Sequence, residues 1–155
     1  MILMRRLRFW RKRFLSVLTR ISYIVHYQLA FAYLGKGLNA EALASAQKSV
    51  ELSKRTQTAL RNLGEVYIKT GKRTEAIAIV KELEDKYAKK ESQAVSVARL
   101  YMLLGDNEKA IVWYEKAFAA KEDITPADVK NNKDAQALRE DPRYKAMLKR
   151  LGLSE

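Results

Sequence analysis

Three stretches of sequence decide the fold when they are aligned: "LAFAYLGKGLNAEALASAQKSVEL" (29–52), "LGEVYIKTGKRTEAIAIVKELEDK" (63–86) and "VARLYMLLGDNEKAIVWYEKAFAA" (97–120). Corresponding positions lie 34 residues apart, with no insertion between the copies. The columns that hold across all copies are Leu29, Leu63 and Val97; Ala30, Gly64 and Ala98; Tyr33, Tyr67 and Tyr101; Gly37, Gly71 and Gly105; and Ala42, Ala76 and Ala110. A fixed period of this length predicts a protein built from stacked, similar units.

Each copy predicts two helices joined by a tight turn. The first is an apolar helix that ends near the glycine, because glycine adopts the positive φ that closes a helix. The second begins a few residues later, and its alanine column is small where two helices approach closely. One helical hairpin leaves an apolar face uncovered, and stacking the next hairpin covers it. Only two prolines and six glycines interrupt the chain, so the predicted fold class is all-α.

This pattern resembles the tetratricopeptide repeat. The repeats would occupy 23–56, 57–90 and 91–124. The third carries the fullest set of the family's residues: Ala98, Tyr101, Gly105, Ala110, Tyr114 and Ala117. The resemblance implies a right-handed solenoid of three helical hairpins whose first helices line a concave groove. It also implies a non-enzymatic scaffold or adaptor that binds a peptide or helix of another protein in that groove.

Residues 125–155 are expected to form a helical cap on the last repeat. Thr125-Pro126-Ala127-Asp128 and Asp141-Pro142 both have the composition of a helix start. The second start precedes an apolar stripe made of Tyr144, Met147, Leu148 and Leu151, and Gly152 is the expected stop. The stretch "LREDPRYKAMLKRLGL" resembles the tail of tetratricopeptide regions in bacterial multidomain signalling proteins, which implies a bacterial, regulatory lineage.

The sequence offers little for catalysis. His26 is the only histidine, and there is no cysteine. The sequence therefore has too few of these residues for a histidine-based catalytic triad or for a metal site made of histidines or cysteines. Clustered acids such as Glu82 and Glu84 stand among lysines, as on a solvated face. We therefore expect no enzyme, no cofactor and no metal ion. The absence of cysteine fits the cytosol and the periplasm equally.

By the resemblance, groove side chains come from the second, fifth, ninth and twelfth positions of each repeat. These are Ile24, Tyr27, Phe31 and Leu34; Thr58, Arg61, Glu65 and Ile68, with Asn62 beside them; and Ser92, Val95, Arg99 and Met102. The candidate binding residues are Tyr27, Phe31, Arg61, Asn62, Glu65, Arg99 and Met102. A groove that is aromatic at one end and polar further along suits a peptide with an apolar anchor and an acidic or C-terminal group.

Other roles for these residues stay open at this point. Arg61 and Glu65 are four apart on one helix, so they can form a surface ion pair instead of contacting a ligand. Tyr27 and Phe31 can be buried beneath the N-terminal segment. The family's chaperone-binding subset grips a C-terminal carboxylate with a lysine and an asparagine where this chain has Tyr27 and Phe31. Only Asn62 matches that pattern, so the specialised function is not expected.

The N-terminal segment carries most of the excess charge. The net charge is +12, and residues 1–22 hold seven basic side chains with no acid; the first acid is Glu41. Apolar residues recur with alternating spacings of four and three: Leu3, Leu7, Trp10, Phe14, Val17, Ile21 and Ile24. On a helix these form one stripe. We expect a basic amphipathic helix over 1–22 that tethers the protein through Leu3, Leu7, Trp10, Arg11, Lys12, Arg13 and Phe14.

Four interpretations of this segment compete. It can lie on an anionic membrane surface, or it can pack into the chain's own groove or against a second copy in a homo-oligomer.

The other two interpretations fit less well. The segment is a poor match to a targeting segment, because Arg20 interrupts any secretory apolar region and no cleavage site follows. Nucleic-acid binding would leave the apolar stripe unexplained. A transmembrane span is disfavoured by Arg20, His26 and Gln28 within 14–34. The expected location is cytoplasmic, or peripheral at the inner membrane.

Overall fold

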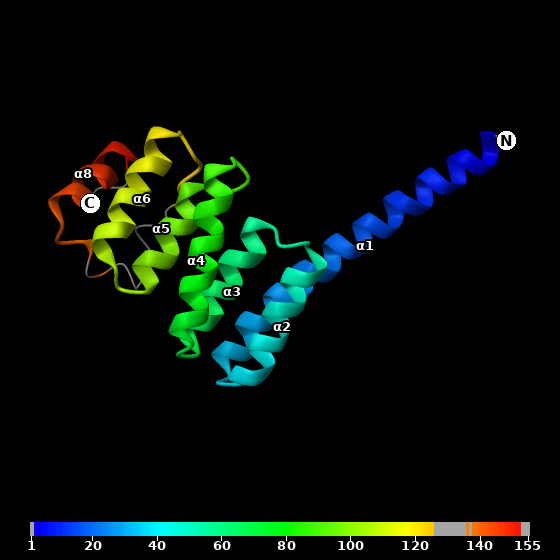
Figure 1. Cartoon of the computed structure of the whole chain (residues 1–155), viewed down its shortest axis with the longest axis horizontal. Helices are drawn as coiled ribbons and strands as arrows, with labels where there is room; N and C mark the ends of the chain where they lie inside the picture. Colours follow the sequence, from blue (N-terminus) through cyan, green and yellow to red (C-terminus); the bar gives the residue numbers. More distant parts are fainter. Residues whose placement is uncertain (1, 126–135, 137, 153–155) are drawn as a thin grey trace.

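The computed structural model describes residues 2–125, 136 and 138–152; within the first helix it describes the side chains of residues 13–18 and from 21 onward. This part of the chain is all-helical (Figure 1). Its main helices, in order, are α1 (Ile2–Gly35), α2 (Asn39–Leu52), α3 (Gln57–Lys69), α4 (Arg73–Ala88), α5 (Ala94–Leu103), α6 (Asn107–Ala119) and α8 (Pro142–Arg150). The predicted hairpins are therefore α1–α2, α3–α4 and α5–α6.

The three hairpin turns share one backbone geometry. Gly37, Gly71 and Gly105 have φ of 73°, 77° and 78°. In the second turn the N–H of Gly71 donates to the carbonyl of Ile68 at 3.1 Å, and the N–H of Lys72 donates to the carbonyl of Tyr67 at 2.8 Å. The same pair of bonds closes the other two turns. This is a Schellman motif, whose left-handed position favours glycine. The predicted role of the glycine column is thus confirmed.

Small residues allow the hairpins to stack closely. Ala42, Ala76 and Ala110 of the second helices are fully buried. At Gly64 of α3, an added Cβ would lie 2.7 Å from a methyl group of Leu100 on α5. The backbones of the first helices therefore approach each other closely at the core.

Each hairpin packs on the next along the chain. α1 contacts α2 and α3, α3 contacts α4 and α5, and α5 contacts α6. Polar contacts add to this packing: Nε2 of Gln57 in the second repeat donates to Oε1 of Gln93 in the third at 2.8 Å. Within the third repeat, the carboxylate of Glu122 accepts from the N–H groups of Ala94 and Val95 at 2.8 and 2.9 Å, which caps the start of α5. The result is a solenoid in which the first helices lie in a row.

The C-terminal helix α8 covers the end of this solenoid, as predicted. Asp141 caps α8 by accepting the N–H of Arg143 at 2.8 Å, and Pro142 is the first helical residue. Tyr144 is buried with its ring 6.1 Å from that of Tyr114 on α6. Gly152 has φ of 69° at the helix end. The other predicted helix start is Thr125-Pro126-Ala127-Asp128. Its last three residues lie outside the described residues.

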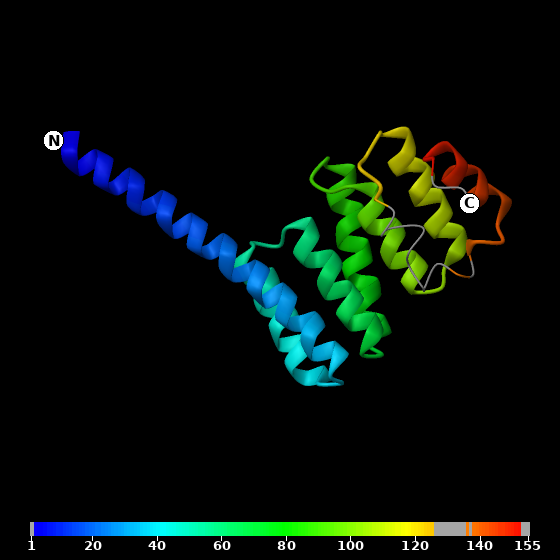
Figure 2. The same cartoon turned by 180° about the vertical axis from the view of Figure 1, so that it is seen from behind.

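α1 is one continuous helix, and the expected boundary between residues 22 and 23 carries no break. No glycine or proline stands between Ile2 and Leu34 to bend it. Its second half packs on α2 and α3, whereas its first half extends beyond the repeats with no other element beside it (Figures 1 and 2). The hypothesis that this segment fills the chain's own groove is therefore wrong for this structure. No described helix is long and apolar enough to cross a membrane.

Candidate ligand-binding groove

A cavity of about 570 Å³ opens where the three first helices lie side by side. Its lining residues are Tyr27 and Phe31 of α1; Arg61, Asn62 and Glu65 of α3; Val95 and Arg99 of α5; and Gln93, Asp123 and Thr125 of the connecting segments. The structure thus brings together six of the candidate groove residues, because the repeat period places their positions on one face of successive hairpins.

Aromatic rings form the α1 side of the cavity. Tyr27 and Phe31 are one helical turn apart, and their ring centroids lie 5.3 Å apart with an interplanar angle of 74°. Both are half-buried. They belong to the same continuous helix as the N-terminal segment, so that segment cannot fold over them, and the burial hypothesis for these rings is wrong. An edge-to-face pair of this kind offers a rigid apolar surface to a ligand.

Glu65 pairs with the next repeat and not with its own helix. A guanidinium nitrogen of Arg99 lies 3.5 Å from Oε2 of Glu65, whose side chain is buried. The hypothesis of an ion pair between Arg61 and Glu65 is wrong, because within the described part of the chain Arg61 forms no ion pair. The stacking of α5 on α3 brings Arg99 to Glu65, and each charge lowers the cost of burying the other.

Arg61 and Asn62 each place at the cavity a hydrogen-bond donor that has no acceptor among the described residues. The two donors are Nε of Arg61 and Nδ2 of Asn62, and both atoms are buried. Asn62 as a whole is only 5% exposed. A buried donor without an acceptor costs free energy, and a ligand oxygen would recover it if a small rotation of the side chain brought the donor to the cavity surface. The cavity therefore combines an apolar wall with donors that a carbonyl or a carboxylate would satisfy.

Met102 does not belong to this cavity. It is 2% exposed, and its sulfur accepts a hydrogen bond from the hydroxyl of Tyr114 at 3.8 Å. Its position on α5 lies nearer the hairpin turn than Val95 and Arg99, where α6 covers it. Met102 is a core residue, and its expected place in the groove is corrected accordingly.

Gln93, Asp123 and Thr125 line the cavity although the sequence did not indicate them. Gln93 sits immediately before α5, where its N–H donates to the side-chain oxygen of Gln57 at 2.6 Å. The other two follow α6: Asp123 is near the end of the third repeat, and Thr125 comes just after it. In the sequence, the one indication of their role was that they stand at the ends of repeats. The stacking of the hairpins brings those ends beside the first helices.

The expected tether residues are placed only in part. Leu3, Leu7, Trp10, Arg11 and Lys12 lie on α1, but their side chains are outside the described set. Arg13 and Phe14 are exposed, the latter at 65%.

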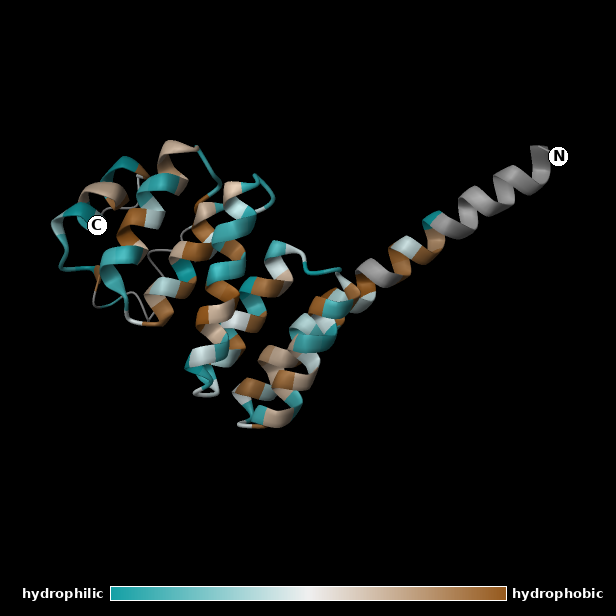
Figure 3. Cartoon of the chain, viewed as in Figure 1, coloured by the Kyte–Doolittle hydropathy of each residue, from teal (hydrophilic) through white to brown (hydrophobic). Residues whose placement is uncertain are grey.

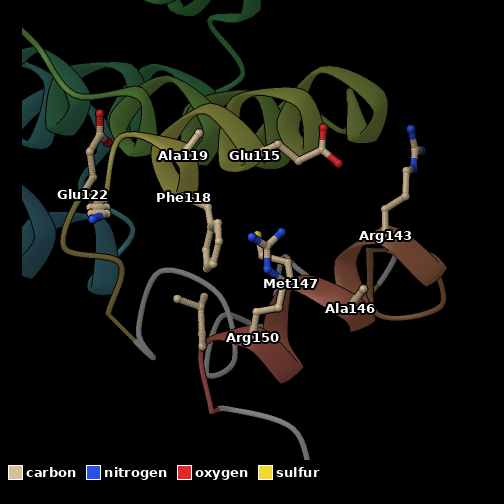
Figure 4. Close-up of a pocket in the computed structure, with 10 residues that line it drawn as sticks. Glu115, Phe118, Ala119, Glu122, Arg143, Ala146, Met147 and Arg150 are labelled. Atoms are coloured by element: carbon tan, nitrogen blue, oxygen red, sulfur yellow. The ribbon is translucent and has the colours of Figure 1, made fainter.

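A larger cavity, of about 830 Å³, lies between α6 and α8 (Figure 4). Its apolar lining includes Phe118 and Met147, and the guanidinium of Arg150 lies 3.8 Å from the ring centroid of Phe118. Arg143 at its rim bonds to Glu108 and Asp141, at 2.9 and 2.8 Å. None of the buried side-chain donors without an acceptor in the described part of the chain belongs to the lining of this cavity. Among the residues described, no cluster of histidine, aspartate and glutamate side chains is placed to bind a metal ion.

Stacked helical hairpins of this kind define a helical-repeat protein. The chain belongs to the tetratricopeptide repeat family: family models of that description match residues 23–56 and 95–124, and 59–87. Such repeats generally act as non-enzymatic modules that bind other proteins. No curated protein and no solved structure gives a significant match to the chain.

Proposed function

We propose that this chain is an adaptor that holds a peptide segment of another protein in the groove between α1, α3 and α5. The observation that carries the proposal is the pair of buried, unmet donors on Arg61 and Asn62 beside the aromatic pair Tyr27 and Phe31. The rings would pack against an apolar side chain of the ligand. The donors would form hydrogen bonds with an oxygen atom that comes next along the peptide.

The charges of the residues that line the groove indicate which kind of ligand it binds. Arg99 and Glu65 neutralise one another, which leaves the guanidinium of Arg61 to attract an anion. Asp123 is exposed at the rim, where water screens it. A ligand with an apolar or aromatic side chain close to an acidic side chain or a C-terminal carboxylate fits this arrangement best.

The projecting half of α1 serves, in this proposal, as a tether to a membrane or to a second protein. It carries the basic, acid-free stretch of the chain and an exposed apolar face. A protein that holds one partner in its groove and is fixed elsewhere by α1 works as a scaffold. The similarity of its C-terminal tail to bacterial signalling proteins fits a regulatory setting.

A display library of random peptides tests the groove. We expect the selected peptides to carry an apolar residue near a carboxylate, and to bind R61A and N62A at least about tenfold more weakly than the wild type, as expected for losing a charged or buried hydrogen bond. Melting temperatures of both variants should stay close to that of the wild type, since the lost donors have no partner in the free protein.

Lys81→Ala is the matched control, because Lys81 is an exposed cation on α4, away from the cavity. Its affinity for the same peptides should be unchanged. Peptides that bind R61A, N62A and K81A as tightly as the wild type would contradict the proposed groove.

A further inference from the structure

The exposed face of α1 is apolar over most of the described length of the helix. Its exposed large apolar side chains are Phe14, Leu15, Val17, Leu18, Ile21, Ile24, Val25 and Leu29. At 3.6 residues per turn, these residues cover about half of the helix circumference. Figure 3 shows the brown residues continuing along α1 beyond the part that α2 accompanies. A contiguous apolar surface of this kind, on a helix standing clear of its fold, marks an interaction surface.

The fold itself does not use this face. α1 packs on α2 through its other side, where Ala30 is buried and the carbonyl of Tyr23 accepts a hydrogen bond from Oγ of Ser49 at 2.9 Å. Figure 2 views the molecule from the side on which α1 runs in front of α2. Contact with a flat surface on this side would therefore leave the packing of the first hairpin in place.

The charge on α1 decides what can cover the face. Seven basic side chains and no acidic one lie within residues 1–22, and the first acid of the chain is Glu41. A second copy would bring an identical cationic segment, with no carboxylate on α1 to pair with it, so the two segments would repel each other. The anionic headgroups of a lipid bilayer supply the opposite charge continuously, beside an apolar layer that accepts the side chains.

We propose that α1 lies along an anionic bilayer surface, with the face around Leu18, Ile21 and Val25 in the boundary between headgroups and acyl chains. This inference rests on the proposed tether and names its partner. On the helical wheel, Tyr27 and Phe31 lie about 160° and 120° around α1 from Val25. These two groove side chains therefore lie off the apolar face of α1, so that lipid contact and groove binding use different faces of the helix.

Cosedimentation of the full chain with vesicles tests the proposal. The probe is an equimolar mixture of phosphatidylcholine and phosphatidylserine, compared with phosphatidylcholine alone. We expect the wild type to pellet with the mixed vesicles, to pellet less as salt is raised, and to remain largely in solution with the neutral ones. Leu18→Glu/Val25→Glu should weaken binding about 100-fold or more, because each substitution removes a side chain buried in the lipid boundary.

The matched control is Ile77→Glu/Val112→Glu, which adds the same charges on α4 and α6. Its positions are 39% and 44% exposed, against 47% and 49% for Leu18 and Val25, so neither double variant should change the melting temperature much. The control should pellet with the mixed vesicles far better than the α1 variant. Arg61→Ala should pellet like the wild type, so a failure of lipid binding is distinguishable from a failure of the groove.

Several outcomes would overturn the proposal. No pelleting of the wild type with the mixed vesicles excludes the lipid surface. Equal pelleting of the two double variants shows that the α1 face is not the contact. If the wild type is a dimer by sedimentation equilibrium and only the Leu18→Glu/Val25→Glu variant becomes a monomer, then a second copy covers the face instead.

Discussion

Gly105 and Gly35 are both exposed glycines near helix ends, but their backbones differ. Gly105 has φ of 78° in the turn between α5 and α6, whereas Gly35 is the last residue of α1 and does not have a positive φ. An added Cβ would meet nothing within 4 Å at either position. The two sites thus separate the conformational effect of a side chain from its packing effect.

We expect Gly105→Ala to lower the free energy of unfolding by about 1–2 kcal/mol, because alanine is strained in the left-handed region. Gly35→Ala should raise it by about 0.5–1 kcal/mol, since alanine favours the helical backbone. Urea unfolding followed by circular dichroism measures both values. Equal effects of the two substitutions would show that the positive φ of Gly105 is not what the turn requires.

The residue types that set the backbone could be predicted from the sequence. A glycine such as Gly71, placed after an apolar helix, is typical of the turn that closes a helical hairpin. Glycine recurs at this position in each copy of the 34-residue repeat. Gly64 was recognised only as small, because the 2.7 Å approach of Leu100 to its added Cβ depends on how α5 stacks on α3. The pairing of Arg99 with Glu65 was missed for the same reason: it joins residues 34 apart in the chain, whereas the one ion pair considered from the sequence was between Glu65 and Arg61 on the same helix.

At the scale of the element, helix starts and stops were the most predictable feature. Asp141-Pro142 specifies the start of α8 locally, through a side-chain cap and a preset φ. Met102 shows the opposite case. Its helical position matched the groove pattern, but the cavity occupies only the end of α5 near Val95, and Tyr114 of α6 covers the other end. A helical period identifies a face but not which part of it a neighbouring helix covers.

The start of α8 also predicts a dependence of stability on pH. Hydrogen bonds from Arg143 lower the pKa of Asp141 from 3.8 to about 2. Since the folded protein has the lower pKa, the stabilisation is complete above the unfolded value and is lost as the pH falls through about 2. Asp141→Asn keeps a side-chain cap but removes the titration.

Thermal melting at a series of pH values measures this contribution. We expect the wild type to melt at a higher temperature than Asp141→Asn at about pH 5, and the difference to shrink as the pH falls toward about 2. The other carboxylates titrate in both proteins and cancel in the comparison. A difference in melting temperature that stays constant over this range would mean that the charge of Asp141 does not stabilise α8.

At the scale of the whole molecule, the stacking of hairpins creates the groove. Arg61 and Arg99 come together because α1, α3 and α5 lie in a row, and the period places equivalent positions on one face. The same period does not predict Asp123 and Thr125, which stand at the end of the third repeat and just after it, away from the groove positions of the first helices. The larger cavity between α6 and α8 involves Arg143 and Phe118, which no repeat position connects, so sequence reasoning had no means to foresee it.

The presence of these two cavities makes the location of the ligand the decisive question. We place the ligand at Arg61 and Asn62, whose buried donors lack acceptors among the described residues, and not in the larger cavity, where Arg143 is already paired. Binding at the groove should perturb residues of three separate repeats at once. Binding at the larger cavity should perturb α6 and α8 alone.

The most direct test is a map of amide chemical shifts of the full chain during titration with a library-selected peptide. We expect the changes to cluster on α1 near Tyr27 and Phe31, on α3 near Arg61 and Asn62, and on α5 near Arg99. The indole and amide signals of α6 and α8 should change little. Changes confined to residues around Phe118 and Met147 would contradict the account, because they would place the ligand between the last repeat and its cap.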